Sequence, residues 1–438
     1  MPASASSLPS PLALNALDYA RACNAAGLPG IGGHLALDRY SKFYREGLRT
    51  DPLIPGGLLP PVGRIATSEG PEGAAVKFTL VVSRPASGRD GAAIGNGQSA
   101  IDAAYPPPAS SRLPIASAPI EIESVLIPMI GKKRTRSYTL CVSSQVGCAM
   151  GCTFCQTAQM GLIRSLSAAE IVAQWYTARH IIARPDPDAP ITNIVFMGMG
   201  EPMDNLDEVV RAIDILTDRR GPAVAMRKIT VSTVGRIDGI ARLAERVRVP
   251  GWHRLGLAVS LNSPNDATRS GIMPINRSTP MAALREALCA WPLYAGAHLC
   301  IEYVLIPGVT DSEDAPEQLA SFMLGSAYPS APLPLGGAGG GSCIPPCVPS
   351  CLGASVPSGL PLYPGPPLQA LVNVIPYNPR DNSPWPAPTE ESVEAFVAKL
   401  SSLGVYVKRR RTKGRDTMAA CGQLGNPEMR RRRAPAAA

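Results

Sequence analysis

Residues 141–161 read CVSSQVGCAMGCTFCQTAQMG, and three cysteines in this stretch decide how the rest of the chain is interpreted. Cys148, Cys152 and Cys155 form a C-x3-C-x2-C pattern. Iron–sulfur clusters are held by cysteine thiolates, and a cubane ligated by protein alone needs four of them. Three close thiolates can therefore hold three irons of a 4Fe-4S cluster and leave the fourth iron open. An open iron can bind the amine and carboxylate of S-adenosylmethionine and pass an electron into its sulfonium.

A structural zinc site is the alternative for the same cysteines, and it needs a fourth ligand nearby. Cys141 is the candidate within reach, and the loop contains no histidine. The loop also follows TLCVSS (139–144), which we expect to be the first strand of a sheet whose strand ends bind cofactors. The pattern favours an iron–sulfur cluster over zinc.

Downstream of the cysteine loop, short strand-like segments alternate with helix-like segments. Such alternation indicates parallel βα units, so the predicted fold class is α/β. Six or more units in one chain favour an open or closed barrel with its chemistry at the carboxyl ends of the strands. The predicted strands are 139–144, 191–198, 227–233, 255–261, 298–306, 371–377 and 405–410, and the predicted helices are 167–182, 204–219, 236–247, 281–291, 311–324 and 389–402.

The flanks of this regular core are harder to interpret. The N-terminal region has helical periodicity at 34–49 and a strand-like stretch at 75–83, and Gly, Pro and Ser dominate after it. The predicted parts are a weakly defined N-terminal accessory region (1–83), a linker (84–118), the core (119–425) and a basic disordered tail (426–438).

Residues 325–368 are dense in Pro and Gly and cannot supply a βα unit. We interpret them as an insertion in the loop before the last barrel strand. They contain Cys343, Cys347 and Cys351 at even spacing, which suggests a second metal site. Metal ligands need firm support from surrounding residues that a flexible segment lacks, so the insertion is expected to bind no metal.

The charge and the cysteine content narrow the class of protein. The formal net charge is +8, and bases cluster at 131–136, 407–415 and 429–433, a balance that suits a polyanionic partner. Four of the eleven cysteines fall within fifteen residues of one another, which indicates a metal or redox site in a reducing compartment rather than a disulfide framework.

The chain contains no run of eighteen apolar residues, so we expect no transmembrane helix and no membrane partner. The N-terminus lacks the basic region of a secretory signal. The expected location is the cytoplasm, and the alternative is a chloroplast or mitochondrion if the Ser- and Ala-rich N-terminus is a transit peptide.

The cysteine loop, with its TFC, resembles the radical S-adenosylmethionine (radical SAM) superfamily. Six further segments resemble one family within it, which methylates C2 of adenine in 23S ribosomal RNA and, in some members, in transfer RNA. The resemblance covers about 119–325 and 369–425, and it implies a radical-SAM partial (βα)6-type barrel with a small N-terminal accessory domain, acting as a monomer. The segments are VFMGMGEPMDN (195–205), ITVSTVGR (229–236), AVSLNSPNDATRSGIMPINR (258–277), IPGVTDS (306–312), VNVIPYNP (372–379) and GRDTMAACGQL (414–424).

The resemblance implies a reaction that uses two molecules of S-adenosylmethionine per turnover. One molecule methylates Cys421, and the other is cleaved to a 5′-deoxyadenosyl radical that takes a hydrogen from the new methyl group. The carbon radical adds to C2, and Cys141 then attacks the sulfur of Cys421 to form a disulfide bond. Read alone, each of these two cysteines is more often a buried apolar residue. The cluster would need a reducing electron donor such as a flavodoxin or ferredoxin.

The resemblance also assigns cofactor contacts. Gly200 and Glu201 would bind the amino group of S-adenosylmethionine, since a carboxylate suits an ammonium group. Glu123 matches a proton acceptor, although Cys141 could take the same proton. Asn262 stands where many relatives have His. The remaining predicted contacts, which in isolation read as turn or strand-end residues, are Ser232, Ser260, Leu261 and Asn378.

Two other functions stay open at this point. Methylation at adenine C8 would use the same apparatus, and an inactive iron–sulfur protein could still bind RNA. The basic runs at 131–136 and 408–415 are predicted to flank the mouth of the active site, where phosphate contacts give affinity rather than sequence choice. The divergent N-terminal region leaves the preferred RNA undetermined.

Overall fold

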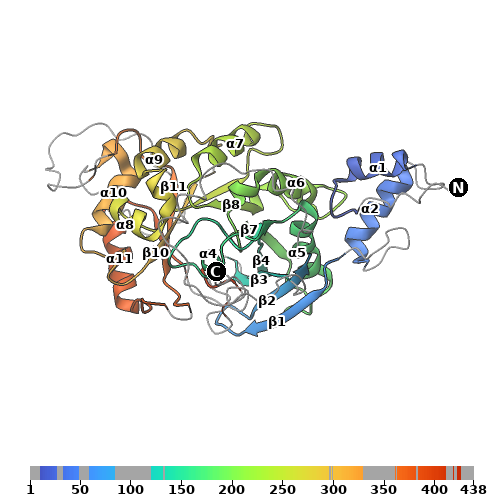
Figure 1. Ribbon diagram of the computed structural model, residues 1–438, viewed down its shortest axis with the longest axis horizontal. Helices are drawn as coiled ribbons and strands as arrows, with labels where there is room; N and C mark the ends of the chain where they lie inside the picture. The colour runs from blue at the N-terminus through green and yellow to red at the C-terminus, as the bar shows by residue number, and fades with distance from the viewer. Residues whose placement is uncertain are drawn as a thin grey trace, which may run out of the picture.

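The computed structural model describes residues 10–26, 33–48, 59–83, 120–131, 134–294, 297, 299–328, 361, 363–380, 383–410, 418 and 422–425. A ten-stranded sheet runs through these residues in the order β1-β2-β3-β4-β7-β8-β9-β10-β11-β12 (Figure 1). Strands β1 and β12 are its two edges, so the sheet is open in the part of the chain described.

In the ten-stranded sheet β4 and β7 to β12 are parallel, and a helix follows each of them up to β11, which confirms the α/β class and the parallel sheet. The strands are β4 (Arg136–Cys141), β7 (Ile191–Phe196), β8 (Ile229–Thr233), β9 (Gly256–Ser260), β10 (Leu299–Leu305), β11 (Ala370–Pro376) and β12 (Val407–Arg409). The helices are α5 (Ala168–His180), α6 (Leu206–Thr217), α7 (Ile237–Val247), α8 (Asp266–Ile272), α9 (Met281–Cys289), α10 (Ala315–Leu324) and α11 (Glu390–Ser402).

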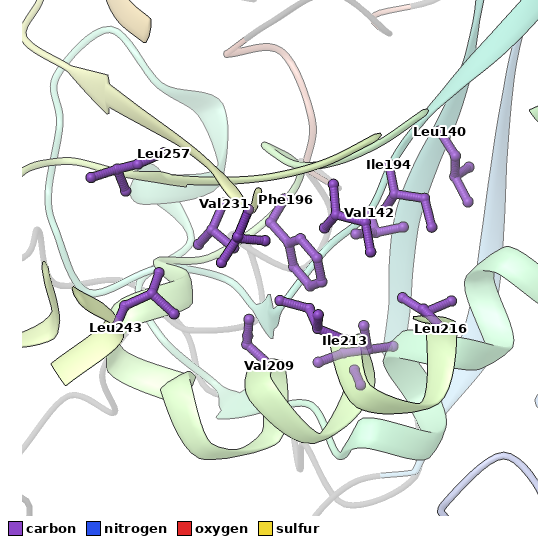
Figure 2. Packing of buried hydrophobic residues seen from close by; sticks show 14 of the residues in the cluster. Leu140, Val142, Ile194, Phe196, Val209, Ile213, Leu216, Val231, Leu243 and Leu257 are labelled. Atoms are coloured by element: carbon purple, nitrogen blue, oxygen red, sulfur yellow. The ribbon is translucent and has the colours of Figure 1, made fainter. Parts of the chain in front are cut away.

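Alternation along the strands separates an apolar core from a polar interior. Side chains in a strand point alternately to the two faces of the sheet. Ile194 and Phe196 of β7 are fully buried against Val209 and Ile213 of α6 (Figure 2). Asn193, on the other face of β7, lines the inside of the curved sheet. The helices therefore cover one face, and the opposite face is left for polar groups and ligands.

The N-terminal region joins the same sheet. Strands β1 (Val62–Ser68), β2 (Ala75–Val82) and β3 (Ile120–Ile130) are antiparallel and lead into β4, which agrees with the strand expected at 75–83. Helix α1 (Ala16–Ala25) lies beside α2 (His34–Glu46) (Figure 1), and α2 contacts α5, where the Phe43 and Tyr176 rings stack at 4.5 Å. The helix expected at 34–49 is thus confirmed, whereas α1 and β1 were not predicted. The predicted boundaries between the accessory region, the linker and the core, at residues 83 and 119, stay a prediction.

The two ends of the predicted insertion meet. Just after α10, the amide of Ser326 donates to the carbonyl of Gly365 at 2.9 Å, and the Gly365 amide donates to Ser326 Oγ at 3.0 Å. Arg285 of α9 donates to the carbonyls of Phe322 and Pro366, at 2.7 and 2.5 Å, and also to that of Pro364. These contacts place the segment between α10 and β11, as expected. The three evenly spaced cysteines of the segment lie outside the described residues.

The remaining elements are short. They are α4 (Gln156–Gln159), the two-stranded sheet of β5 (Gln145–Val146) and β6 (Arg164–Ser165), and the 3-10 turns η2 (Pro202–Asn205), η3 (Met226–Lys228), η4 (Pro274–Arg277) and η5 (Gly325–Ala327). Among the described residues, none of the helices combines the length and apolar character needed to span a bilayer.

Candidate active site

The cysteine loop leaves β4 and folds back on itself before α5. The amide of Cys148 donates to the carbonyl of Gly161 at 3.1 Å, which closes the loop at its base. Gly147 makes this closure possible, because its φ is +75° and a Cβ there would lie 1.9 Å from the Gly161 oxygen. Cys148, Cys152 and Cys155 all line one cavity of about 150 Å³, which we call the cofactor cavity. The three predicted cluster ligands are thus brought together.

The chemistry of these thiols fits a cluster better than a single ion. Burial raises the pKa of Cys148, Cys152 and Cys155, so the thiols would stay protonated without a cationic group to stabilise the thiolates. No group of three His, Cys, Asp or Glu side chains in the described residues is placed to hold one metal ion. Three thiols are one ligand short of the four that a structural zinc site takes, whereas a cubane takes one thiolate on each of three separate irons.

Most predicted cofactor contacts line the same cavity. They come from the carboxyl ends of β7, β8, β9 and β11, where ligands of parallel α/β folds bind. Leu261 is different, because its side chain is fully buried in the main apolar core and lies outside the cavity lining. The predicted residues that do line the cavity are Gly200, Glu201, Ser232, Ser260, Asn262 and Asn378.

Glu201 is held rigidly at the cavity wall. Its carboxylate accepts from the amides of Met203 at 3.1 Å and Val234 at 2.9 Å. Burial raises the pKa of Glu201 to about 7, although these two donors act to lower it. A cationic group in the cavity would favour the ionised form. The preceding Gly200 has φ +98°, and a Cβ there would lie 2.5 Å from the Cβ of Gln145, so the turn that aims Glu201 requires glycine.

A segment near the C-terminus forms part of the same wall. The amide of Gln156 donates to the Gly422 carbonyl at 2.8 Å, and Thr157 Oγ1 donates to the Leu424 carbonyl at 2.5 Å. Gly422 and Leu424 both line the cofactor cavity. Cys421, the predicted methyl acceptor, lies outside the described residues, but the residue that follows it is bound to the cysteine loop.

Glu123 contacts this segment rather than the cavity. Its carboxylate accepts from the amide of Gly425 at 2.8 Å and forms a buried ion pair with Lys77 at 2.9 Å. Lys77 Nζ also donates to the carbonyl of Met418 at 3.0 Å. The pair therefore bonds to residues on both sides of Cys421. The predicted role of Glu123 as a proton acceptor stays a prediction.

Cys141 lies at the end of β4 and is 6% exposed. It belongs to a small apolar cluster with Met160, Met199 and Leu424. Leu424 also lines the cofactor cavity, so Cys141 lies behind the wall that the C-terminal segment forms. The disulfide expected between Cys141 and Cys421 stays a prediction, because Cys421 lies outside the described residues.

Comparison with known proteins identifies the family. A sequence profile of the Radical SAM superfamily matches residues 142–317. The probable dual-specificity RNA methyltransferase RlmN 1 of Protochlamydia amoebophila is 37% identical over 315 residues, which is 72% of each chain. The dual-specificity RNA methyltransferase RlmN of Phenylobacterium zucineum is 38% identical over 70% of this chain and 67% of its own. The chain belongs to the radical SAM RNA methyltransferase family of the RlmN type.

A solved structure agrees with this assignment. The radical SAM methyltransferase of Sphaerobacter thermophilus superposes with a TM-score of 0.67 at 30% identity, covering 95% of this chain and 98% of that one. The match to this solved structure is therefore not confined to the segments whose motifs we quoted.

Arg269 supports the site of this family member and was not predicted from the sequence. Its guanidinium is fully buried and donates to the carbonyls of Val234 at 2.5 Å and Leu261 at 3.0 Å. A third bond, of 2.8 Å, reaches Asn276 Oδ1. Burial lowers the pKa of Arg269 to about 10, which leaves it charged at neutral pH. An arginine in a short helix is usually exposed to solvent, so the sequence did not indicate that Arg269 is buried beside the site.

Asn262 has a backbone conformation that explains its residue type. Its φ is +56°, a left-handed conformation that Asn tolerates better than most residues. Its Oδ1 accepts from the amide of Val304 at 3.1 Å, which fixes the side chain across the ends of β9 and β10. The side-chain amide of Asn262 therefore has a structural use besides its predicted contact with the cofactor.

Proposed function

We propose that this RlmN-type protein methylates C2 of an adenine in 23S ribosomal RNA, and in transfer RNA, by radical chemistry. One observation carries the proposal: the three cluster cysteines and Glu201 line a single cavity whose wall includes Gly422, the residue next to Cys421. A methyl-accepting thiol at this wall would be adjacent to the cofactor that methylates it. The curated relatives named above are dual-specificity RNA methyltransferases.

Different residues of the cofactor cavity would bind the cluster and S-adenosylmethionine. A 4Fe-4S cluster on Cys148, Cys152 and Cys155 would supply the electron for reductive cleavage of S-adenosylmethionine. Glu201 binds the ammonium group and so orients the sulfonium. Ser232, Ser260 and Asn378 supply polar groups around the rest of the cofactor, which serves twice in each turnover.

The two thiols outside the cluster carry the methyl group and release it. Cys421 loses its proton, and its thiolate attacks the methyl carbon of the sulfonium; a thioether forms on Cys421, and S-adenosylhomocysteine leaves. After the methyl carbon has become bonded to C2 of adenine, the C2 proton is lost and one electron would pass back to the oxidised cluster. The Cys141 thiolate then attacks the sulfur of Cys421, so that a disulfide forms and the carbon–sulfur bond breaks. The carbon keeps the electron pair of that bond and takes up a proton to become the methyl group. A dithiol reductant must open the disulfide before the next turnover. An electron donor of the flavodoxin or ferredoxin kind would serve the cluster.

We infer further that the fold is a partial (βα)6 barrel preceded by an accessory region and interrupted by an insertion. A monomer in a reducing, intracellular compartment suits a chain whose function needs thiolates and an iron–sulfur cluster.

The test is anaerobic incubation of the reconstituted protein with ribosomal RNA fragments and methyl-labelled S-adenosylmethionine, followed by nucleoside mass spectrometry. We expect 2-methyladenosine. Finding 8-methyladenosine would show that the chain methylates C8 of adenine instead of C2. Label on Cys421 without label in RNA would indicate that the methyl group has another final acceptor. Cys421→Ala should abolish methyl transfer and keep the cluster spectrum. Loss of the cluster in that variant would contradict the role of Cys421.

A further inference from the structure

A second, larger cavity lies at the opposite end of the parallel strands. Its volume is about 790 Å³, within the range of about 300–1,000 Å³ typical of ligand pockets. Its lining includes Asn193, Thr230 and Gly256, in the amino-terminal halves of β7, β8 and β9. The cofactor cavity is lined instead by residues at the carboxyl ends of these strands. We call this second site the basal cavity.

The two cavities adjoin inside the curved sheet. Met197, Glu302, Ile375, Asn378 and Arg410 line both of them. Glu302 is 4% exposed, and its charge is balanced by Arg410 at 3.6 Å. The junction is therefore nearly neutral, and a ligand in the basal cavity would lie next to the cofactor cavity.

The rim of the basal cavity carries cations without carboxylate partners. Arg227, Lys228, Arg254 and Lys408 are all exposed there, and no Asp or Glu of the described residues forms an ion pair with any of them. Other exposed arginines on the same molecule are paired, as Arg242 is with Asp207. Glu72 and Glu302 are the carboxylates of the lining, so positive charge predominates. A polyanion suits such a rim.

An aromatic pair lies among these cations. The rings of His253 and Tyr294 are 4.7 Å apart and inclined by 36°, and Tyr294 is 37% exposed. Both residues line the basal cavity beside Arg254. Exposed aromatic rings flanked by bases are the combination with which proteins bind single-stranded nucleic acid, through base stacking and phosphate contacts.

We propose that the basal cavity receives a single-stranded stretch of the RNA substrate. Its phosphates bind Arg227, Lys228 and Arg254, one of its bases stacks on Tyr294, and the target adenine passes the junction toward the cofactor. An acidic protein, such as an electron donor, is the alternative partner for the positively charged rim of the basal cavity. The concave shape and the stacking pair favour RNA, and the cluster that such a donor must reach lies at the other end of the strands.

This inference rests on the proposed function, but its test does not require methyl transfer. A fluorescent RNA hairpin with an adenine in its single-stranded loop is titrated with the full-length, cluster-loaded protein at several salt concentrations. Arg227→Ala/Arg254→Ala should weaken binding at low salt and lower the slope of log K against log salt by about 0.7 for each lost phosphate contact. Tyr294→Ala should weaken binding about five-fold or more, and Tyr294→Phe should restore it.

The matched control is Arg242→Ala/Arg248→Ala, which removes the same charge from exposed, paired arginines outside both cavities. Equal affinities and salt slopes for the two double variants would overturn the proposal. Normal RNA binding with slower cluster reduction by an acidic redox protein would also overturn it, in favour of donor docking. Failure of the wild-type protein to methylate RNA while the basal variants lose RNA binding would reject the proposed function and leave this site standing.

Discussion

At the scale of single residues, the raised pKa of the buried Glu201 affects its proposed binding of S-adenosylmethionine. Its raised pKa of about 7 means that the carboxyl group takes up a proton as the pH falls through neutrality. The protonated form cannot attract an ammonium group, so S-adenosylmethionine should bind more weakly at pH 6 than at pH 8, by up to about tenfold per pH unit below the pKa. Equilibrium dialysis with the labelled cofactor measures this dependence.

Glu201→Gln is the control for that profile. It should bind the cofactor weakly at every pH, with a flat profile between pH 6 and 8. A profile as steep as that of the wild type would assign the titration to another group. The free energy of unfolding of the ligand-free protein has the opposite pH dependence. Because the pKa of Glu201 is higher in the folded than in the unfolded chain, the stability that this group contributes is lost as the pH rises from about 4.5 to 7.

Lys77 and Glu123 allow a second prediction at the residue scale. Lys77→Met leaves a buried carboxylate without its cation, and breaking such a pair costs about 3 kcal/mol or more. Because Lys77 also bonds to Met418, methylation of Cys421 should slow while the cluster spectrum stays unchanged. Lys77→Arg should recover much of the rate. Single-turnover mass spectrometry of the protein measures the methyl-cysteine directly.

Glu123→Gln separates positioning from proton transfer. If Glu123 positions the C-terminal segment, the variant should methylate Cys421 more slowly. If Glu123 accepts a proton, the variant should methylate Cys421 normally and stop after the adduct with RNA has formed, so that protein crosslinked to RNA accumulates. Normal rates of both steps would contradict both roles.

At the scale of elements, the insertion between α10 and β11 allows a deletion. Its ends are joined by the bonds between Ser326 and Gly365, so a short linker can span the distance between them. Replacing residues 329–360 with a short Gly–Ser linker should change the free energy of unfolding by less than about 1 kcal/mol, since loop length enters only logarithmically. Urea denaturation and the methyl-transfer rate are the measurements.

Arg285→Ala is the matched variant for that deletion. It removes the donors to three carbonyls at the ends of the insertion and should destabilise the protein by about 1–3 kcal/mol. A deletion that is more harmful than Arg285→Ala would show that residues 329–360 contribute to folding or activity.

The element scale is also where the sequence is most informative. The strand expected at 191–198 is Ile191–Phe196, and the helix expected at 236–247 is Ile237–Val247. Their apolar periodicity is a local property, so it can be found without the fold. Lys77 and Glu302 were missed because their partners, Glu123 and Arg410, are distant in sequence. No local pattern indicates which buried charge will meet which.

At the scale of the whole molecule, one apolar core extends from the N-terminal helices through the sheet to α11. Tyr176 of α5 connects the N-terminal helices to the sheet, because its hydroxyl lies within hydrogen-bond distance of the carbonyls of Phe43 at 2.9 Å and Leu48 at 2.8 Å and has one proton to share between them. Tyr176→Phe should lower the free energy of unfolding by about 1–3 kcal/mol. Far-ultraviolet circular dichroism and the iron–sulfur absorbance should report the same midpoint under anaerobic denaturation.

Two separate midpoints in that experiment would show that the N-terminal region unfolds independently, as an accessory domain would. Tyr294→Phe, which changes a half-exposed ring outside the core, should leave the midpoint unchanged and serves as the control.

The bond from Thr157 to Leu424 spans 267 residues of chain. Ribosomes make the chain from its N-terminus, and folding begins before synthesis ends. The cysteine loop therefore leaves the ribosome long before the segment that forms the last part of the cavity wall. A half-made chain has neither Cys421, the proposed methyl acceptor, nor Gly422 and Leu424, which bond to the cysteine loop. Under the proposed function, methyl transfer is thereby withheld from the nascent chain until nearly all of it has been translated.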